Sequence, residues 1–521
     1  MKSKKGFGIK KLLNVVFSQK FIVLSLLLLQ IAFLIFAIFV LAEQFVFVYY
    51  FLLAIELIIV MYIVNSDENP AYKLAWIVPV LLFPMFGAFA FIYLKFQSSY
   101  RYEKNLITKK IENTKPFLRQ KASVIKALEE HDMSVANLAH YVRVYGGYPV
   151  YQNTKVQYFS LGEKKFEAMV RELEGAKHFI FMEYFIIDKG YMWDTIHEIL
   201  VRKAREGVEV RLMYDGMGTQ SILPFRYERT LRAEGIDVKV FNPFVPLVAT
   251  IQNNRDHRKI LVIDGHTGFT GGVNIGDEYI NKRERFGHWK DTAVMLKGEA
   301  VWNLTMMFLQ LWEITGDQTV AKYEMYSPTT FEHLDTQDDS FVLPFSDSPL
   351  DKENVGELVY MNIINHAKEY VYISTPYLIP DHEMITSLCY AAKSGVDVRI
   401  VVPGIPDKWY VKLIGESFYK PLIANGVKVY EYDKGFIHAK NFVSDDSTAV
   451  VGTINLDYRS LYLHFECAAF MYGTDCVKDI KEDFLELFEE HCHRVTYEEC
   501  NERPIAHRML SAVLGLFAPL L

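Results

Sequence analysis

Three long apolar runs dominate the hydrophobic pattern near the N-terminus, at residues 21–42, 45–64 and 74–94. Each run matches the roughly 20 residues that a helix needs to cross the hydrocarbon layer of a membrane. The first run has features of a cleaved signal peptide, but it exceeds the usual apolar length of ~7–15 residues and further apolar sequence follows it. The pattern therefore predicts N-terminal transmembrane helices.

Two features make the second and third runs atypical. Glu56 interrupts the second run, and a carboxylate in a membrane is costly unless it is paired or faces a neighbouring segment. Pro79, Pro84 and Gly87 predict a kink or a re-entrant shape in the third run. Basic residues flank the runs on both sides, and three full crossings cannot place both basic ends in the cytoplasm. The side of the membrane that holds the rest of the chain stays open.

From about residue 155 the pattern changes to short apolar runs that alternate with amphipathic segments. Runs such as 179–187 and 208–215 are typical of buried strands, and their alternation with helical spacing indicates parallel strands and crossover helices. The same order of segments then recurs in the second half of the chain. Segments that begin at Ala176, Gly207, Gly235 and His257 have counterparts that begin at Ala367, Gly395, Gly426 and His438.

The expected fold is therefore α/β. It is a duplicated domain with two mixed or parallel sheets, flanking helices and a pseudo-two-fold relation, preceded by the transmembrane helices. The expected parts are membrane segments and a basic connector at 1–110, a first copy at 111–335, a second copy at 336–500 and an amphipathic tail at 501–521. The tail suits an interfacial helix as well as it suits packing against a domain.

Composition excludes several classes of protein. Hydrophobic residues make up 51% of the chain and the net charge is −7, which excludes a disordered chain and disfavours a basic nucleic-acid-binding surface. The five cysteines form no CxxC pair, so neither a disulfide framework nor a structural zinc site is expected. The chain also lacks metal-binding motifs of the HExxH, EF-hand or Walker type, so the expected chemistry uses no metal ion and no cofactor.

Each copy carries one motif with titratable side chains at fixed spacing. The candidate catalytic residues are His257, Lys259 and Asp264 in the first copy and His438, Lys440 and Asp445 in the second. A histidine and a lysine two residues apart on a strand point to the same face. The aspartates fall where the strand turns, so a role in the turn is as natural as a catalytic one.

Two copies of the motif at matching positions predict one shared site, although a single copy would be weak evidence. One imidazole can attack phosphorus while the other protonates the leaving alcohol. The two lysines, with Asn274 and Asn455 beyond the turns, are expected to bind the non-bridging oxygens of a phosphate. Asp291 and Glu466 lie in apolar, strand-like sequence and are expected to orient the histidines, the alternative being an edge-strand salt bridge.

These motifs resemble those of the phospholipase D superfamily, and the details resemble its bacterial cardiolipin synthase branch. The likeness rests on the paired HxKxxxxD motifs, the apolar segment AWIVPVLLFPMFGAFAFIYL, the continuations GGVNIGDEY and TINLDYRS, the sequence HWKDT, and the ending RPIAHRMLSAVLGLFAPLL. It extends over about residues 45–521, whereas residues 1–44 look like an extension.

The resemblance implies a phosphatidyltransferase of the bacterial cell membrane that crosses the membrane more than once. It would use phosphatidylglycerol as both donor and acceptor and release cardiolipin and glycerol, without a metal ion. By similarity, His257 would carry a phosphatidyl-histidine intermediate and His438 would serve as acid and base, with the two roles open to exchange.

Other functions remain as alternatives. A phospholipase D-type phosphodiesterase would hydrolyse lipid headgroups with the same residues. A nuclease would require a basic stripe with stacking aromatic side chains. An inactive membrane scaffold would be expected to lack at least one of the two His-Lys pairs. Self-association and the range of acceptor alcohols stay open.

Overall fold

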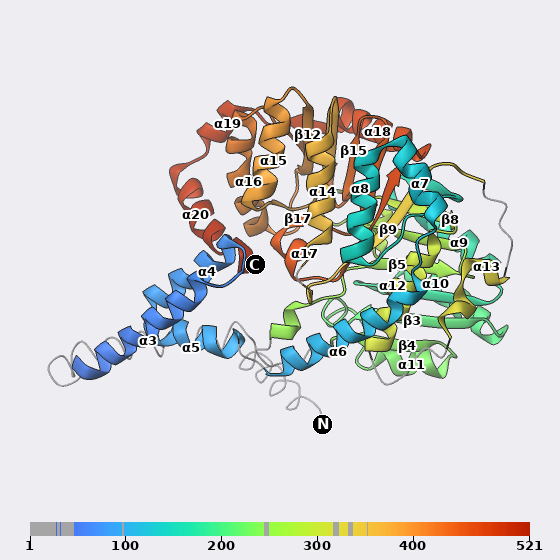
Figure 1. The fold of residues 1–521 in the computed structure, drawn as a ribbon, viewed down its shortest axis with the longest axis horizontal. Coiled ribbons are helices and arrows are strands. Elements are labelled where there is room, and N and C mark those ends of the chain that lie inside the picture. The colour runs from blue at the N-terminus through green and yellow to red at the C-terminus, as the bar shows by residue number, and fades with distance from the viewer. Residues whose placement is uncertain are drawn as a thin grey trace, which may run out of the picture. The chain divides into compact units, whose positions relative to one another are not determined.

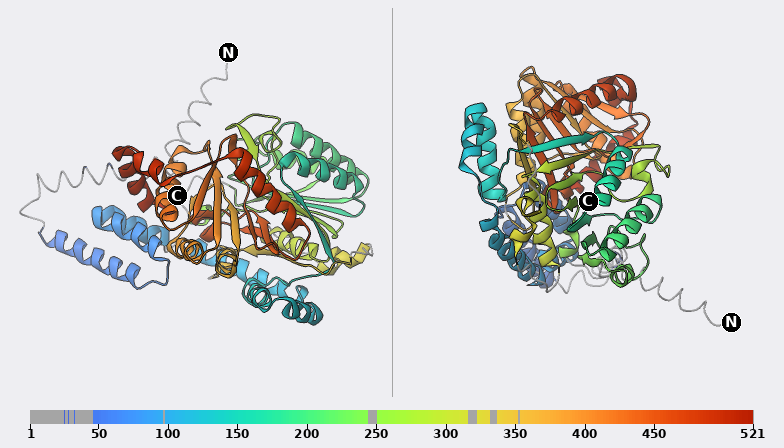
Figure 2. Two further views of the ribbon diagram at one scale, coloured as in Figure 1. Left: turned by 90° about the horizontal axis from the view of Figure 1, so that it is seen from above. Right: turned by 90° about the vertical axis from the view of Figure 1, so that its right-hand side faces the viewer.

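The computed structural model describes residues 46–95, 98–243, 250–315, 322–331, 337–351 and 353–520, together with Ser25, Leu28 and Ala32. The chain divides into two compact units. The first unit comprises residues 1–104, 244–253 and 516–521, and the second comprises residues 105–243 and 254–515. Figures 1 and 2 show the course of the chain through these units.

Three helices pack together in the part of the first unit that the structure describes. They are α3 (Val46–Val64), α4 (Pro70–Leu82) and α5 (Pro84–Lys95). The third apolar run is thus divided between α4 and α5, as its prolines predicted, because proline is favoured at the start of a helix and disfavoured inside one. Gly87 allows the two helices to approach closely, since a Cβ atom there would lie 2.5 Å from the Pro79 carbonyl oxygen.

Within the described residues, none of the helices is both long enough and apolar enough to cross a membrane. The first predicted run, 21–42, lies outside the described residues except for Ser25, Leu28 and Ala32. In α3, the side chain of Glu56 is only 4% exposed, which agrees with the expectation that it faces a neighbouring segment.

The second unit contains two related sheets. The first sheet has the strand order β1-β8-β6-β5-β2-β3-β4. Its strands are β1 (Thr154–Phe159), β2 (Phe179–Tyr184), β3 (Glu209–Asp215), β4 (Asp237–Phe241), β5 (Lys259–Ile263), β6 (Thr267–Gly271) and β8 (Ala293–Gly298). Strands β2, β3 and β4 run parallel to one another, and the remaining neighbours are antiparallel.

The second sheet has the order β19-β13-β12-β10-β15-β16-β18-β9. Its strands are β9 (Phe341–Asp347), β10 (Tyr370–Ser374), β12 (Asp397–Pro403), β13 (Lys428–Tyr432), β15 (Asn441–Ser444), β16 (Thr448–Gly452), β18 (Glu466–Tyr472) and β19 (Cys492–Arg494). Read from β13, this order repeats the first sheet read from β4, strand for strand, and β19 is an added edge strand. The predicted duplication of a mixed α/β unit is therefore confirmed.

Helices cover the two sheets (Figure 1). Those of the first half are α9 (Gly162–Gly175), α10 (Tyr191–Arg205), α11 (Tyr227–Ala233), α12 (Val301–Ile314) and α13 (Pro328–Phe331). Those of the second half are α14 (Val355–His366), α15 (His382–Lys393), α16 (Trp409–Ala424), α17 (Tyr458–Tyr462) and α18 (Cys476–Glu486). The last two helices, α19 (Tyr497–Glu502) and α20 (Ile505–Leu516), contact α16 instead. The helices α6 (Ser98–Thr114), α7 (Ala122–His131) and α8 (Met133–Tyr141) precede the first sheet.

The two halves are joined by backbone pairing at two matching places. Strand β7 (His288–Lys290) pairs in parallel with β14 (Gly435–Ile437), just before His438. At the corresponding place in the other half, Asp256 forms a parallel bridge with Phe465, just before His257. The sheets also contact each other through β6, β8, β16 and β18. These contacts place the starts of β5 and β15 at the seam between the halves.

Candidate active site

Both motif histidines lie at this seam, at the entry to a central strand. His257 precedes β5 and His438 precedes β15, and the two residues are buried with 8% and 7% exposure. The backbone N–H of His257 donates to the Phe465 carbonyl oxygen (2.9 Å), and that of His438 donates to the Lys290 carbonyl oxygen (2.7 Å). Each histidine is therefore positioned by the backbone of the other half.

The orienting carboxylates are also exchanged between the halves. His257 Nδ1 lies 2.9 and 3.0 Å from the two carboxylate oxygens of Glu466, which belongs to the second half. His438 Nδ1 lies 2.6 Å from Asp291 Oδ2, which belongs to the first half. The structure thus brings both predicted carboxylates to the histidines, and a carboxylate at Nδ1 leaves Nε2 of each ring for the substrate.

Burial favours the neutral form of both imidazoles while no substrate is bound. Desolvation lowers the pKa of His257 to about 3, although the Glu466 carboxylate acts in the opposite direction. Desolvation and the neighbouring Lys440 ammonium lower the pKa of His438 to about 4, against the effect of Asp291. A neutral imidazole has a free lone pair, as a nucleophile or a general base requires.

The two motif lysines share the electrostatic environment of the histidines. Lys259 Nζ donates to the backbone oxygen of His257, and Lys440 Nζ donates to that of His438. Burial lowers the pKa of Lys259 to about 8 and that of Lys440 to about 7. The pKa of Lys440 is lowered further by Lys259 and raised by Asp291 and Glu466. Residues from both motifs therefore act on one another within a single buried site.

Asp264 and Asp445 do not join this site. Each lies at the end of its strand away from the histidine and bonds three consecutive backbone N–H groups. Asp264 accepts hydrogen bonds from Lys177, His178 and Phe179 at 2.7–2.8 Å. Asp445 accepts the corresponding bonds from Lys368, Glu369 and Tyr370 at 2.7–3.1 Å. This geometry favours the turn role that the sequence left open beside a catalytic one, in which the aspartates tie a hairpin to the start of the neighbouring strand.

Replacement of Asp264 by asparagine is expected to cost stability rather than chemistry. An amide NH₂ would face one of the N–H donors, so at least one charge-assisted bond is lost, at a cost of about 2–3 kcal/mol. Asp445→Asn is the matched control and is expected to cost less, because Asp445 is more exposed than Asp264. Denaturant unfolding and turnover per folded molecule measure the two effects. An unchanged unfolding midpoint with lost turnover would contradict the turn role.

The two asparagines predicted to bind phosphate are held by internal hydrogen bonds. Asn274 Oδ1 accepts from the Ile186 N–H (3.0 Å), and its Nδ2 donates to the Tyr279 hydroxyl (2.9 Å). Asn455 Nδ2 donates to Ser460 Oγ (3.0 Å) at the corresponding place. These bonds fix the loops after β6 and β16, and a direct contact of either amide with phosphate stays a prediction.

Several polar residues around the site were not predicted from the sequence. Arg258 is buried between the two motif residues His257 and Lys259, and its Nε donates to Glu183 Oε1 (2.6 Å). Lys165 Nζ donates to the Val273 carbonyl oxygen (3.1 Å), and in the second half the Tyr360 hydroxyl donates to the matching Ile454 carbonyl (3.0 Å). Because a lysine and a tyrosine fill the same position in the two halves, comparison of the repeats gives no signal for either residue.

Two groups of described residues have side chains close enough together to hold a metal ion. They are His257, His464 and Glu466, and the more exposed Glu486, Glu490 and His491. In the first group, the Glu466 carboxylate already accepts from His257 Nδ1, which favours orientation of the imidazole over metal binding.

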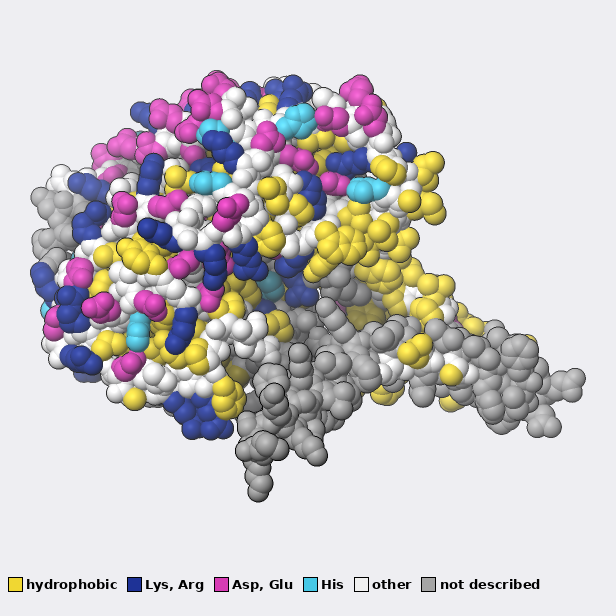
Figure 3. Space-filling view, turned by 180° about the vertical axis from the view of Figure 1, so that it is seen from behind, with side chains coloured by type: hydrophobic (Ala, Val, Ile, Leu, Met, Phe, Trp, Pro, Cys, Tyr) yellow, Lys and Arg dark blue, Asp and Glu magenta, His cyan; other side chains and the backbone are white. Residues whose placement is uncertain are grey.

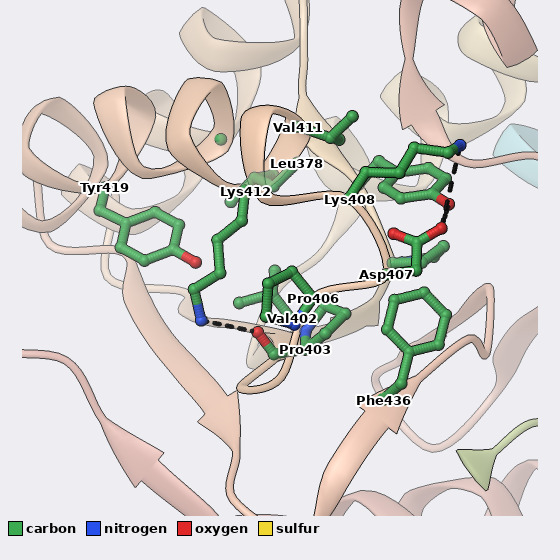
Figure 4. Close-up of a pocket in the computed structure, with 13 residues that line it drawn as sticks. Leu378, Val402, Pro403, Pro406, Asp407, Lys408, Val411, Lys412, Tyr419 and Phe436 are labelled. Carbon is green, nitrogen blue, oxygen red and sulfur yellow. Dashed lines mark hydrogen bonds and ion pairs between the residues drawn. The ribbon is translucent and has the colours of Figure 1, made fainter. Parts of the chain in front are cut away.

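A small pocket lies beside His438 in the second half (Figure 4). Phe436 points toward it, and the ring of Phe436 is 5.8 Å from that of His438. On the opposite wall, Lys412 Nζ donates to the carbonyl oxygens of Pro403 (3.1 Å) and Gly404 (2.6 Å). Its ammonium is thus used to hold the loop after β12.

Comparisons with known proteins agree with this geometry. Residues 169–312 and 360–488 match a family model described as "Cardiolipin synthase, PLD-like domain". A protein of Streptococcus mutans described as uncharacterized is 49% identical over 459 residues, which cover 88% of this chain and 98% of that protein. A cardiolipin synthase of Geobacillus sp. is 37% identical over 462 residues, with 88% and 90% covered.

A further cardiolipin synthase, from Alkalihalophilus pseudofirmus, is 34% identical over 463 residues, with 88% of this chain and 90% of that protein covered. The crystal structure of a phosphatidylserine synthase from Haemophilus influenzae has a TM-score of 0.55 at 14% identity, and the match covers 70% of this chain and 95% of that one. At this level of identity the structural likeness concerns the fold.

Proposed function

The chain belongs to the cardiolipin synthase family of proteins with phospholipase D-like domains, and we propose that it transfers a phosphatidyl group between two phosphatidylglycerol molecules. The products are cardiolipin and glycerol. The observation that carries this proposal is the pairing of two buried histidines, each with a carboxylate from the opposite half, at one seam. Such a site supplies a nucleophile on one side of a phosphodiester and an acid on the other.

In the first step, Nε2 of His257 attacks the phosphorus of one phosphatidylglycerol. His438 takes up a proton when the anionic lipid binds, because the phosphodiester and the Asp291 carboxylate both favour its imidazolium form. The bond from phosphorus to the glycerol oxygen then breaks, and Nε2–H of this imidazolium gives its proton to that oxygen. The Asp291 carboxylate at His438 Nδ1 stabilises the imidazolium that donates this proton. The result is a phosphatidyl-histidine on His257 and free glycerol.

In the second step, His438 is neutral and accepts the proton of the terminal hydroxyl of a second phosphatidylglycerol. That oxygen attacks phosphorus, the phosphorus–nitrogen bond breaks, and His257 returns to its neutral form as cardiolipin leaves. Lys259 and Lys440 neutralise the charge that develops on the non-bridging oxygens, so no step requires a metal ion. A bound phosphodiester anion raises the pKa of both lysines above these lowered values and so favours their ammonium forms.

Membrane association is part of the proposal. Several apolar side chains of the first unit are exposed, among them Phe51, Ile58, Met61, Leu82 and Phe89. The second unit exposes Ile405 and Trp409 near the start of α16, and Ile505, Met509 and Val513 on α20. Figure 3 shows a group of exposed hydrophobic side chains on the surface of the larger unit. Burial of such side chains in a bilayer removes apolar area from water and holds the site where lipid substrates are concentrated.

The alternative is hydrolysis of a lipid headgroup by the same two histidines. Incubation of the full-length protein in vesicles with phosphatidylglycerol labelled in one acyl chain distinguishes the two functions. The transferase yields labelled cardiolipin and free glycerol in equal amounts, and phosphatidic acid stays a minor product. Phosphatidic acid as the main product would replace the transferase by the phosphodiesterase.

A further inference from the structure

The two halves of the site differ at one pair of matching positions. In the first half, Trp289 directly precedes Lys290, whose carbonyl oxygen accepts from the His438 N–H. In the second half, His464 directly precedes Phe465, whose carbonyl oxygen accepts from the His257 N–H. The next residue in each half is the carboxylate that orients the histidine. Trp289 and His464 are therefore equivalent by position but different in chemistry.

Both rings lie against a catalytic imidazole at the same distance. The ring centroids of Trp289 and His438 are 5.6 Å apart, with an interplanar angle of 50°. The ring centroids of His464 and His257 are also 5.6 Å apart, with an angle of 43°. The pseudo-two-fold relation of the halves thus extends to these two side chains.

One ring nitrogen of each residue is buried and has no hydrogen-bond partner among the residues that the structure describes. This holds for Trp289 Nε1 and for Nε2 of His464, whose side chain is 11% exposed and whose Nδ1 lies 3.7 Å from a Glu466 oxygen. Buried polar groups are nearly always paired in folded proteins. Unpaired donors at two equivalent places beside the reacting groups are therefore best explained by a partner that arrives with the substrate.

The direction of the His464 ring follows from the carboxylate that it shares with His257. His464 Nδ1 lies 3.7 Å from Glu466 Oε1, and His257 Nδ1 lies 2.9 Å from the same oxygen. Because both rings turn Nδ1 toward Glu466, both turn Nε2 away from it. For His257 that is the side on which Nε2 meets phosphorus in the proposed mechanism.

We propose that His464 Nε2–H and Trp289 Nε1–H are a pair of donors to the two non-bridging oxygens of the phosphodiester, one oxygen for each half. This subsite for a phosphoryl group rests on the proposed function. A two-fold axis that passes through phosphorus and exchanges the attacking and leaving positions also exchanges the two non-bridging oxygens, so equivalent residues contact different oxygens. His464 keeps Nδ1 toward Glu466 and donates through Nε2–H to its oxygen.

Stereospecific sulfur substitution tests this assignment. The two phosphorothioate diastereomers of phosphatidylglycerol each carry sulfur, a poor hydrogen-bond acceptor, at one of the two non-bridging positions. His464→Phe and Trp289→Phe keep an aromatic ring and remove the N–H donor. Each variant is expected to lower turnover of the normal lipid by roughly 10²-fold, as expected for loss of one donor to an oxyanion.

The expected result is a reversed pattern in the two variants. His464→Phe loses sensitivity to sulfur in one diastereomer only, and Trp289→Phe loses it in the other. His382→Phe, which replaces an exposed imidazole on α15, is the matched control and keeps the sulfur sensitivity of the wild type. The unfolding midpoint of each variant reports any loss of folding.

If the two rings serve packing alone, each variant lowers the turnover of both diastereomers equally, and that result overturns the proposal. Loss of sulfur sensitivity for the same diastereomer in both variants overturns it as well. The test remains separate from that of the overall function. If the wild type releases phosphatidic acid instead of cardiolipin, the proposed function fails. The sulfur pattern is then measured on that hydrolysis, because attack on the same phosphorus precedes both products.

Discussion

Replacement of His257 by alanine is expected to abolish cardiolipin formation, with turnover reduced by about 10⁴-fold or more. The reason is that no other side chain takes the place of its Nε2 as the nucleophile in the proposed mechanism. His438→Ala is expected to reduce turnover by about 10²–10⁴-fold, the usual contribution of a positioned acid and base. Both variants are expected to stay folded, because the backbone bonds at positions 257 and 438 do not depend on the side chain.

A donor lipid with a nitrophenyl headgroup separates the two roles. Nitrophenolate leaves without being protonated, so the first step no longer requires the acid. His438→Ala is then expected to release one equivalent of nitrophenol and to retain a phosphatidyl group on His257. His257→Ala is expected to release none. His382→Ala, which removes an exposed imidazole on α15, is the control. A burst of nitrophenol from His257→Ala would assign the nucleophile to His438.

The crossed carboxylates lead to the second large effect. Glu466→Gln is expected to slow the reaction by about 10²-fold or more, because a neutral amide orients the imidazole poorly and does not stabilise its cation. Since Glu466 bonds His257, this variant should slow the release of nitrophenol from the activated lipid. Asp291→Asn acts on His438 and should spare that release while it blocks cardiolipin formation.

The opposite pattern would mean that each carboxylate serves the histidine of its own half. Asp381→Asn provides a measure of what the loss of any buried carboxylate costs, since Asp381 accepts from the Met384 N–H (2.9 Å) and the Tyr462 hydroxyl (2.7 Å) instead of an imidazole. Rates are compared at equal amounts of folded protein, determined from the unfolding curve of each variant.

The repeated motifs made the duplicated fold and the family predictable from the sequence. Short continuous apolar runs located the central strands, and two histidines at equivalent places in a repeat predicted a shared site. The partner of each histidine was not predictable, because separation along the chain does not reveal that β7 pairs with β14 and that Phe465 binds beside His257. Local pattern alone cannot report contacts that form between two domains.

Other differences have local physical causes. Asp264 and Asp445 have the same spacing from the histidines of their copies, which resembles a catalytic pattern. The Asp264 carboxylate nevertheless accepts from backbone donors at a turn where its φ is +50°. The third apolar run has the length of a membrane helix, yet it forms two shorter helices that meet at Pro84. In both cases the residue type was informative, whereas its role depended on the neighbouring backbone.

The exchange of carboxylates between the halves also has a consequence for how such a protein can evolve. A half expressed alone would possess one histidine but not the carboxylate that holds its ring in the tautomer with a free Nε2. Activity would then require a dimer of two such halves. Once both halves are encoded in one polypeptide, they are always present in equal amounts, and their two sequences no longer need to be identical. Each side can then specialise, as the divergence of an indole from an imidazole at equivalent positions already illustrates.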